Sequence, residues 1–312
     1  MLQVLNATGP IYLLVALGFV LTRTGVFHRA QIMALGLFIS KVALPCLIGG
    51  TLARSDPRKV LNPTYLTTYG LASLAAFGAG VAVAMLIWKL KLTPAAFVGM
   101  GAGGSNSAFM GYPIALSIVP QAAGLSLGMN AMIEMIILIP LILLLADLGA
   151  AGSGWTALRR AAIGLFKNPI LIGVFLGLIW SFTPFELPGV LNSTLLLVGA
   201  ATSPVALIYC GGMLVGLNPR KELGRAAVIS AMKLLLHPAL AMGVLWLLTT
   251  LGMPALEPQM RTALLITAAL PCFMAGPIYA SKHGLAEGAS AAVAVSTIMS
   301  FFTLSALIAF LH

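Results

Sequence analysis

The chain has 312 residues, of which 60% are apolar and only 8% are charged. A soluble domain usually carries about a quarter charged residues, so this composition excludes an ordinary water-facing surface and indicates an integral membrane protein. The net charge of +10 comes from 17 Lys and Arg that form short clusters between apolar runs, without the basic face that nucleic-acid binding requires. Seven carboxylates, mostly in turns, and four His without ligand or triad spacing argue against an enzyme, a metal centre and a cofactor.

Ten apolar segments approach the length of about 20 residues that a helix needs to cross a bilayer. The first half contains five, at about 5–21, 30–53, 64–88, 94–119 and 121–148. The second half contains five more, at about 169–185, 189–216, 226–250, 259–280 and 288–311. We therefore predict an all-α membrane protein with a first part at 1–150, a cytoplasmic linker at 151–168 and a second part at 169–312. The linker sequence WTALRRAAIGLFK is compatible with a helix along the lipid headgroups or with a plain connection.

The connections between these segments differ in basic residues. One side carries Arg23, Arg29, Lys89, Lys91, Arg159, Arg160, Lys167, Arg220, Lys221, Arg225 and Lys282. The other side carries only Arg54, Arg58, Lys59 and Arg261. Because cytoplasmic connections are enriched in Lys and Arg, the first side is predicted to be cytoplasmic, and ten spans then place both termini outside.

Two pairs of sequence segments indicate an internal repeat. GGTLARSDPRK begins at Gly49 and GGMLVGLNPRK at Gly211, an offset of 162 residues. FMGYPI begins at Phe109 and FMAGPI at Phe273, an offset of 164 residues. Each repeat holds five spans, an odd number, so the second copy is predicted to be inverted in the membrane relative to the first. Inverted repeats of this kind are typical of secondary transporters.

The fourth and ninth spans contain Gly and Pro at positions that interrupt a continuous helix. Freed backbone groups are tolerated at membrane depth only where they face protein or a water-filled cavity, although kinks that serve packing alone are an alternative. Half-helices beginning near Pro113 and Pro277 would direct free N–H groups towards the bilayer centre, where a carboxylate would bind. The candidate substrate-binding residues at these breaks are Ser105, Asn106, Ser107, Gly111, Tyr112, Pro113, Pro271, Cys272, Gly276 and Pro277.

Four ionisable residues lie inside predicted spans, where a charge costs about 2.5–3.5 kcal/mol without a partner. Lys41 and Glu134 lie near the midplane. They either pair with each other, or Lys41 attracts the substrate anion while Glu134 carries a coupling proton. His237, before Pro238, is either a proton carrier or a neutral hydrogen-bonding residue. Lys233 is expected about two turns from the cytoplasmic end, where its side chain would snorkel to the interface.

At these residues the sequence resembles the auxin efflux carrier family. SNSAFMGYP in the fourth span is similar to that family's SNTGFxGxP motif, and AMKLLLHPAL in the eighth span is similar to its KLLxxPA pattern. The resemblance implies ten helices in two inverted five-helix repeats, with broken fourth and ninth helices that cross at prolines and form the substrate site. Asn106 and Pro113 match the motif, whereas Ser107-Ala108 replaces Thr-Gly and Pro271-Cys272 stands where plant exporters have a polar Asn. The short connection between the halves resembles the bacterial members, among them malonate carriers.

The expected function is secondary transport of small organic anions across the bacterial inner membrane by alternating access. Spans four and nine would move with their neighbours against a scaffold that includes spans one, two, six and seven. Expected partners are a carboxylate substrate, H⁺ or Na⁺, membrane lipids and, as an open alternative, a second copy of the chain. A sodium-coupled carrier of the bile-acid type, a channel and a non-transporting membrane sensor are the alternatives.

Overall fold

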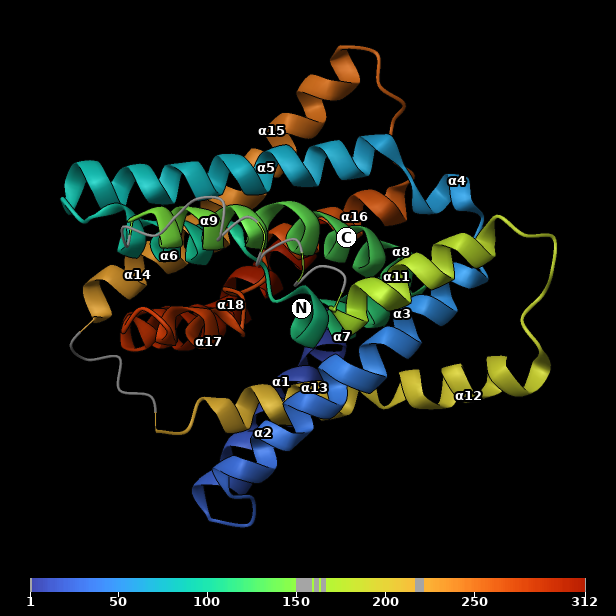
Figure 1. The fold of residues 1–312 in the computed structure, drawn as a ribbon, viewed down its shortest axis with the longest axis horizontal. Helices are drawn as coiled ribbons and strands as arrows, with labels where there is room; N and C mark the ends of the chain where they lie inside the picture. Colours follow the sequence, from blue (N-terminus) through green and yellow to red (C-terminus); the bar gives the residue numbers. More distant parts are fainter. Residues whose placement is uncertain (1, 150–158, 160–162, 164–166, 217–221, 312) are drawn as a thin grey trace. The chain divides into compact units, whose positions relative to one another are not determined.

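The computed structural model describes residues 2–149, 159, 163, 167–216 and 222–311, and every regular element in these ranges is a helix (Figure 1). Six described helices are long and apolar enough to cross a membrane: 29–53, 57–87, 120–149, 189–213, 223–250 and 286–310. Four shorter apolar helices cover 9–23, 92–103, 107–118 and 169–181. The prediction of a helical, multi-pass membrane protein is confirmed. Most of the predicted linker, 151–168, lies outside the described residues.

The described chain divides into two compact units. Unit 1 comprises 1–63, 107–132 and 166–216, and unit 2 comprises 64–106, 133–165 and 217–312. The helices of the predicted first, second, sixth and seventh spans all fall in unit 1, whereas those of the third, eighth, ninth and tenth fall in unit 2. The fourth and fifth spans are each shared between the units.

Unit 1 is held together by helices that approach closely at glycines. Its helices are α1 (Leu2–Arg23), α2 (Arg29–Phe38), α3 (Leu44–Ala53), α4 (Pro57–Val60), α7 (Tyr112–Ile118), α8 (Pro120–Met132), α11 (Pro169–Ser181), α12 (Gly189–Ala200) and α13 (Thr202–Met213). α3 runs against α11 (Figure 1), with Gly49 facing Gly173 and Gly177. α1 packs on α13, with Gly18 and Gly211 at the contact. Small residues allow backbone contact between helices that lipid would not otherwise drive together.

Unit 2 contains the other α-helices whose bounds the structure describes. They are α5 (Pro63–Ala82), α6 (Leu92–Gly103), α9 (Ile139–Gly149), α14 (Leu223–Ala231), α15 (His237–Thr250), α16 (Pro258–Ala268), α17 (Gly276–Ser281) and α18 (Ala286–Leu311). α6 packs on α9, and α14 and α17 pack on α18. An apolar core joins α5, α6 and α9 through Phe77, Phe97, Met100 and Ile142. A second one joins α5, α15 and α16 through Ala72, Ala241 and Leu265.

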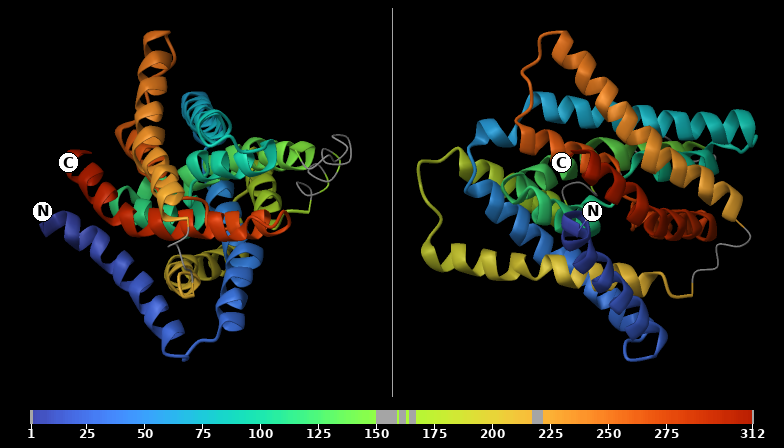
Figure 2. Two further views of the ribbon diagram at one scale, coloured as in Figure 1. Left: turned by 90° about the vertical axis from the view of Figure 1, so that its left-hand side faces the viewer. Right: turned by 180° about the vertical axis from the view of Figure 1, so that it is seen from behind.

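Five π-helical turns interrupt the described helices: η1 (Ile39–Ala43), η2 (Val83–Ile87), η3 (Ser107–Gly111), η4 (Ile133–Leu138) and η6 (Met232–Leu236). In η6 the His237 N–H donates to the Met232 carbonyl five residues earlier, so α14, η6 and α15 form one continuous helix (Figure 2). Three of the ionisable residues inside spans lie in these turns: Lys41 in η1, Glu134 in η4 and Lys233 in η6. Such turns occur frequently at functional sites.

Candidate substrate and ion site

The two interrupted spans meet inside unit 2. α6 ends at Gly103, and Ser105 forms an isolated antiparallel bridge with Cys272 in the gap between α16 and α17. The Asn106 N–H donates to the Pro271 carbonyl at 3.0 Å, and the Cys272 N–H donates to Ser296 Oγ of α18 at 3.0 Å. Backbone groups released by the two breaks are thus satisfied by one another and by a buried hydroxyl, as membrane depth requires.

Pro113 does not begin the half-helix after the first break. The helix starts at Ser107 and runs through η3 into α7 without interruption, since Gly111 is helical with φ −63° and ψ −48°. The prediction of free N–H groups near Pro113 was therefore wrong, because the unbonded N–H groups of a helix lie in its first turn, which begins here at Ser107. The second half-helix does begin at Gly276 and Pro277, but α17 has only six residues.

The predicted site residues divide between the units. Ser105, Asn106, Pro271 and Cys272 are buried and brought together in unit 2, where Gly276 and Pro277 follow in α17. The remaining candidates after the first break belong to unit 1: Ser107, Gly111, Tyr112 and Pro113. Lys41, in the second span, also belongs to unit 1. Lys41 is exposed on η1, whereas Glu134 is buried in unit 2.

Lys233 is fully buried, and the expectation that it snorkels to the interface was wrong. Its Nζ lies 2.8 Å from Ser105 Oγ, 2.8 Å from the Ala268 carbonyl oxygen and 2.6 Å from His237 Nδ1. An ammonium has three N–H donors, and each of them finds an acceptor here. At 1.5 Å per residue Lys233 lies about 15 Å from Leu223 and about 25 Å from Thr250, which is too deep for its ammonium to reach water.

The protonation state of Lys233 determines the tautomer of His237. Because a protonated Lys233 has no acceptor to offer, His237 Nδ1 must accept, and the ring proton is then on Nε2. Nε2 lies 3.1 Å from Ser73 Oγ of α5 and donates to it in this arrangement. Lys233, His237 and Ser73 therefore form one continuous chain of hydrogen bonds, all of it buried.

Glu134 is buried beside the same helix face of α5. The Tyr69 hydroxyl donates to Glu134 Oε1 at 2.5 Å, and the rings of Tyr69 and His237 are 6.0 Å apart. Tyr69 and Ser73 are four residues apart and so lie on one face of α5, as Lys233 and His237 do across η6. This polar cluster, Tyr69, Ser73, Ser105, Glu134, Lys233 and His237, gathers ionisable groups at membrane depth, which is the usual position of a functional site.

A cavity of about 220 Å³ lies within unit 2. Its walls include Gly101 and Cys272 at the break, and Trp88, Glu222 and Arg225 near helix ends. The Arg225 guanidinium lies 5.7 Å from the Trp88 ring centre and 3.6 Å from the Glu222 carboxylate. The cavity thus extends from the interrupted helices to connections that the basic-residue pattern predicts to be cytoplasmic.

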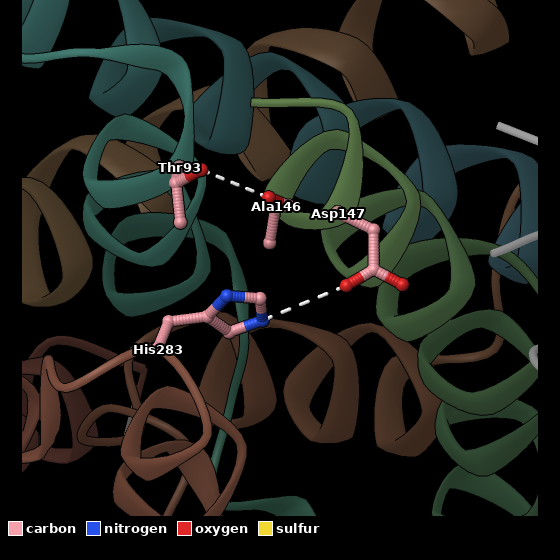
Figure 3. A network of polar contacts seen from close by, with 4 residues as sticks. All are labelled: Thr93, Ala146, Asp147 and His283. Carbon is pink, nitrogen blue, oxygen red and sulfur yellow. Dashed lines mark hydrogen bonds and ion pairs between the residues drawn. The ribbon is translucent and has the colours of Figure 1, made fainter. Parts of the chain in front are cut away.

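Side-chain contacts also tie α9 to the broken helices. Thr93 Oγ1 of α6 donates to the Ala146 carbonyl at 2.8 Å, and His283 Nε2 lies 3.7 Å from Asp147 Oδ1 (Figure 3). His283 follows α17, and its ring also packs on Phe97 of α6, with ring centres 5.5 Å apart. These contacts fix the ends of α6 and α17 that lie away from the break.

Comparison with known proteins agrees with this architecture. The model of the family described as "Membrane transport protein" (Mem_trans, the auxin efflux carrier family) matches residues 3–308. The chain belongs to this family. It is 24% identical to a Rhizobium meliloti protein named "Putative malonate transporter", over 99% of this chain and 96% of the relative. It is 26% identical to an "Uncharacterized transporter" of Methanothermobacter thermautotrophicus, over 94% of each chain.

Sequence reasoning missed Tyr69 and Ser73 as members of the polar cluster in this Mem_trans protein. It also missed that Lys233 is buried within the cluster. The signal for Lys233 was present, because KLLLH places a lysine and a histidine four residues apart on one helix face. Tyr69 and Ser73 repeat that spacing in the third span. Two polar pairs at helical spacing in apolar spans indicate facing helices, since an unpartnered polar group in lipid is costly.

We expect Tyr69→Phe to lower stability by about 1–3 kcal/mol, because the buried Glu134 carboxylate loses the hydrogen bond from the Tyr69 hydroxyl. Combining it with Glu134→Gln, which removes the carboxylate, should recover part of the loss. Thermal unfolding of the purified protein in detergent measures both effects. Equal unfolding temperatures for the wild type and Tyr69→Phe would contradict the importance of this hydrogen bond.

Proposed function

We propose that this Mem_trans protein is a secondary carrier of small organic anions, and that the anion binds at the paired helix breaks of unit 2. The observation that carries the proposal is the bridge between Ser105 and Cys272, with a buried lysine on Ser105 Oγ. A deep cation and interrupted backbone favour binding of a carboxylate at membrane depth. The name of the Rhizobium meliloti relative supports a dicarboxylate such as malonate.

The cavity of unit 2 suits the access path that such a carrier needs. It reaches from the connection at Trp88 and Arg225 to Cys272, which pairs with Ser105. We propose that it admits substrate from the cytoplasm, and that alternating access arises from motion of one unit against the other. The predicted scaffold spans one, two, six and seven all fall in unit 1, which supports this division.

We expect Asn106→Ala to reduce anion counterflow at least tenfold, because Asn106 carries the polar side chain beside Ser105 at the break. The measurement is exchange of labelled malonate, succinate and acetate in proteoliposomes, since exchange separates a carrier from a channel. Ser126→Ala is the matched control, because this buried hydroxyl donates to the Ala123 carbonyl of its own helix. Undiminished exchange in Asn106→Ala would remove the break from the transport path, and no exchange in the wild type would refute the proposed function.

A further inference from the structure

The position of the Lys233 ammonium is defined by the ends of two helices. Ala268, whose carbonyl accepts from Nζ, is the last residue of α16, and Ser105 stands two residues beyond the end of α6. A helix C-terminus carries a partial negative charge and unpaired carbonyls, so it stabilises a cation. Two such ends close together favour a cation between them, and the chain itself supplies one.

We propose that Lys233 is the coupling site of the carrier: its ammonium occupies the place of a coupling metal ion, and anion transport is therefore driven by protons and independent of Na⁺. The inference rests on the proposed function. The inference adds to the proposed function the identity of the coupling ion and of the residue that binds this ion. A protonated Lys233 offsets the charge of a bound carboxylate, and a neutral Lys233 does not.

Ser105 connects the lysine to the substrate. Lys233 Nζ donates to Ser105 Oγ, so the hydroxyl proton of Ser105 points to another acceptor. A carboxylate at the break is such an acceptor. All three donors of Lys233 are already used within the protein, so the lysine acts on the anion through Ser105 and through its charge.

His237 is the proton acceptor in contact with Lys233. A proton moves from Nζ to Nδ1 while the proton on Nε2 passes to Ser73 Oγ, which releases its own proton to water when this face is open. Lysine is left as the neutral amine, the charge leaves with the proton, and the reverse sequence restores the ammonium. The other titratable groups that act on the site are Glu134 of η4, Cys272 at the break and Tyr69 of α5.

The test uses the purified full chain in proteoliposomes, with labelled malonate and succinate as probes. Accumulation driven by an inward proton gradient is measured with Na⁺ present and with Na⁺ replaced by choline, and counterflow is measured at equal pH on both sides. The wild type should accumulate anion equally in both media. Lys233→Gln should lose accumulation at least tenfold. The amide oxygen of His237→Gln still accepts from Lys233. In this variant the fold-loss of accumulation should be at least ten times the fold-loss of counterflow.

Ser230→Ala is the matched control, because its buried hydroxyl bonds the Ala226 carbonyl within α14, less than one turn from Lys233. It should behave as the wild type. Accumulation that requires Na⁺ and ignores the proton gradient would overturn the inference, as would unchanged accumulation in both Lys233→Gln and His237→Gln. Absence of wild-type counterflow refutes the proposed function instead.

If the wild type shows no counterflow, a measurement of the protonation of Lys233 without substrate still tests the inference. NMR of lysine-labelled protein in nanodiscs should show one Nζ signal that Lys233→Gln removes. This signal should titrate, and its titration should shift in His237→Gln but not in Ser230→Ala. A signal that stays in the ammonium form at every pH at which the protein is folded would overturn the inference.

Discussion

Replacing Gly211 by Leu is expected to unfold unit 1. A Cβ atom at Gly211 would overlap the Val15 carbonyl of α1 and lie 2.8 Å from the Phe19 nitrogen. The contact is reciprocal, because a Cβ atom at Gly18 would overlap the Ile208 carbonyl of α13. These are backbone atoms, which cannot rotate away, so the helices must separate along their length. Overpacking usually costs about 1–3 kcal/mol, and this substitution should exceed about 4 kcal/mol.

The measurement is thermal unfolding in detergent, together with the fraction of protein that elutes as one species. Gly9→Ala in the same helix α1 is the matched control, because among the described residues no atom outside the local helix backbone lies within 4 Å of its added Cβ. It should change stability by no more than about 1 kcal/mol, the difference in helix propensity. A folded Gly211→Leu protein with wild-type unfolding temperature would show that α1 and α13 do not depend on backbone contact.

Replacing Gly103 by Val is expected to abolish transport. A Cβ atom there would lie 2.6 Å from the Ser73 carbonyl and 3.0 Å from Phe77 Cβ, both on α5. Gly80 and Gly99 form another close approach between the same helices, with a Cβ at Gly80 lying 2.8 Å from Gly99 Cα. Separating α6 from α5 would displace Ser105, two residues after the substitution, from both Cys272 and Lys233.

Anion counterflow in proteoliposomes measures this effect, with unfolding temperature recorded in parallel. Gly78→Ala on α5 is the control, because its added Cβ lies more than 4 Å from every atom of other parts of the chain that the structure describes. We expect Gly78→Ala to transport as the wild type. Gly103→Val should lose counterflow at least a hundredfold, which corresponds to about 2.8 kcal/mol at 1.4 kcal/mol per tenfold loss. Wild-type counterflow in Gly103→Val would mean that transport tolerates displacement of the break.

The positions of the helix breaks could be predicted more reliably than their chemistry. Gly103, Gly104 and Pro271 remove or weaken backbone hydrogen bonds locally, so the sequence shows where each helix stops. Pro113 has the same composition signal but lies inside a helix, because a π turn precedes it and accommodates the missing N–H. Local sequence does not distinguish these outcomes, because it does not show where a π turn forms.

The burial of Lys233 could not be deduced from its distance to a predicted helix end. Its partners Ser105 and Ala268 come from two other helices, 128 and 35 residues away in the sequence. Only the meeting of the two breaks brings these acceptors together at membrane depth. Glu134 is buried, but its donor Tyr69 follows from the packing of η4 on α5, which a single sequence does not reveal.

The π turns have a mechanical consequence for the helices that contain them. A π turn holds one residue more than an α-helical turn, and one residue corresponds to about 100° around the helix axis. If η6 were to relax into regular α-helix, the helical segment on one side of η6 would rotate about the helix axis by that angle. The backbone hydrogen bonds of this segment would stay intact. Lys233 lies within this turn, so an axial rotation would carry its side chain away from Ser105 and Ala268 without unwinding the helix.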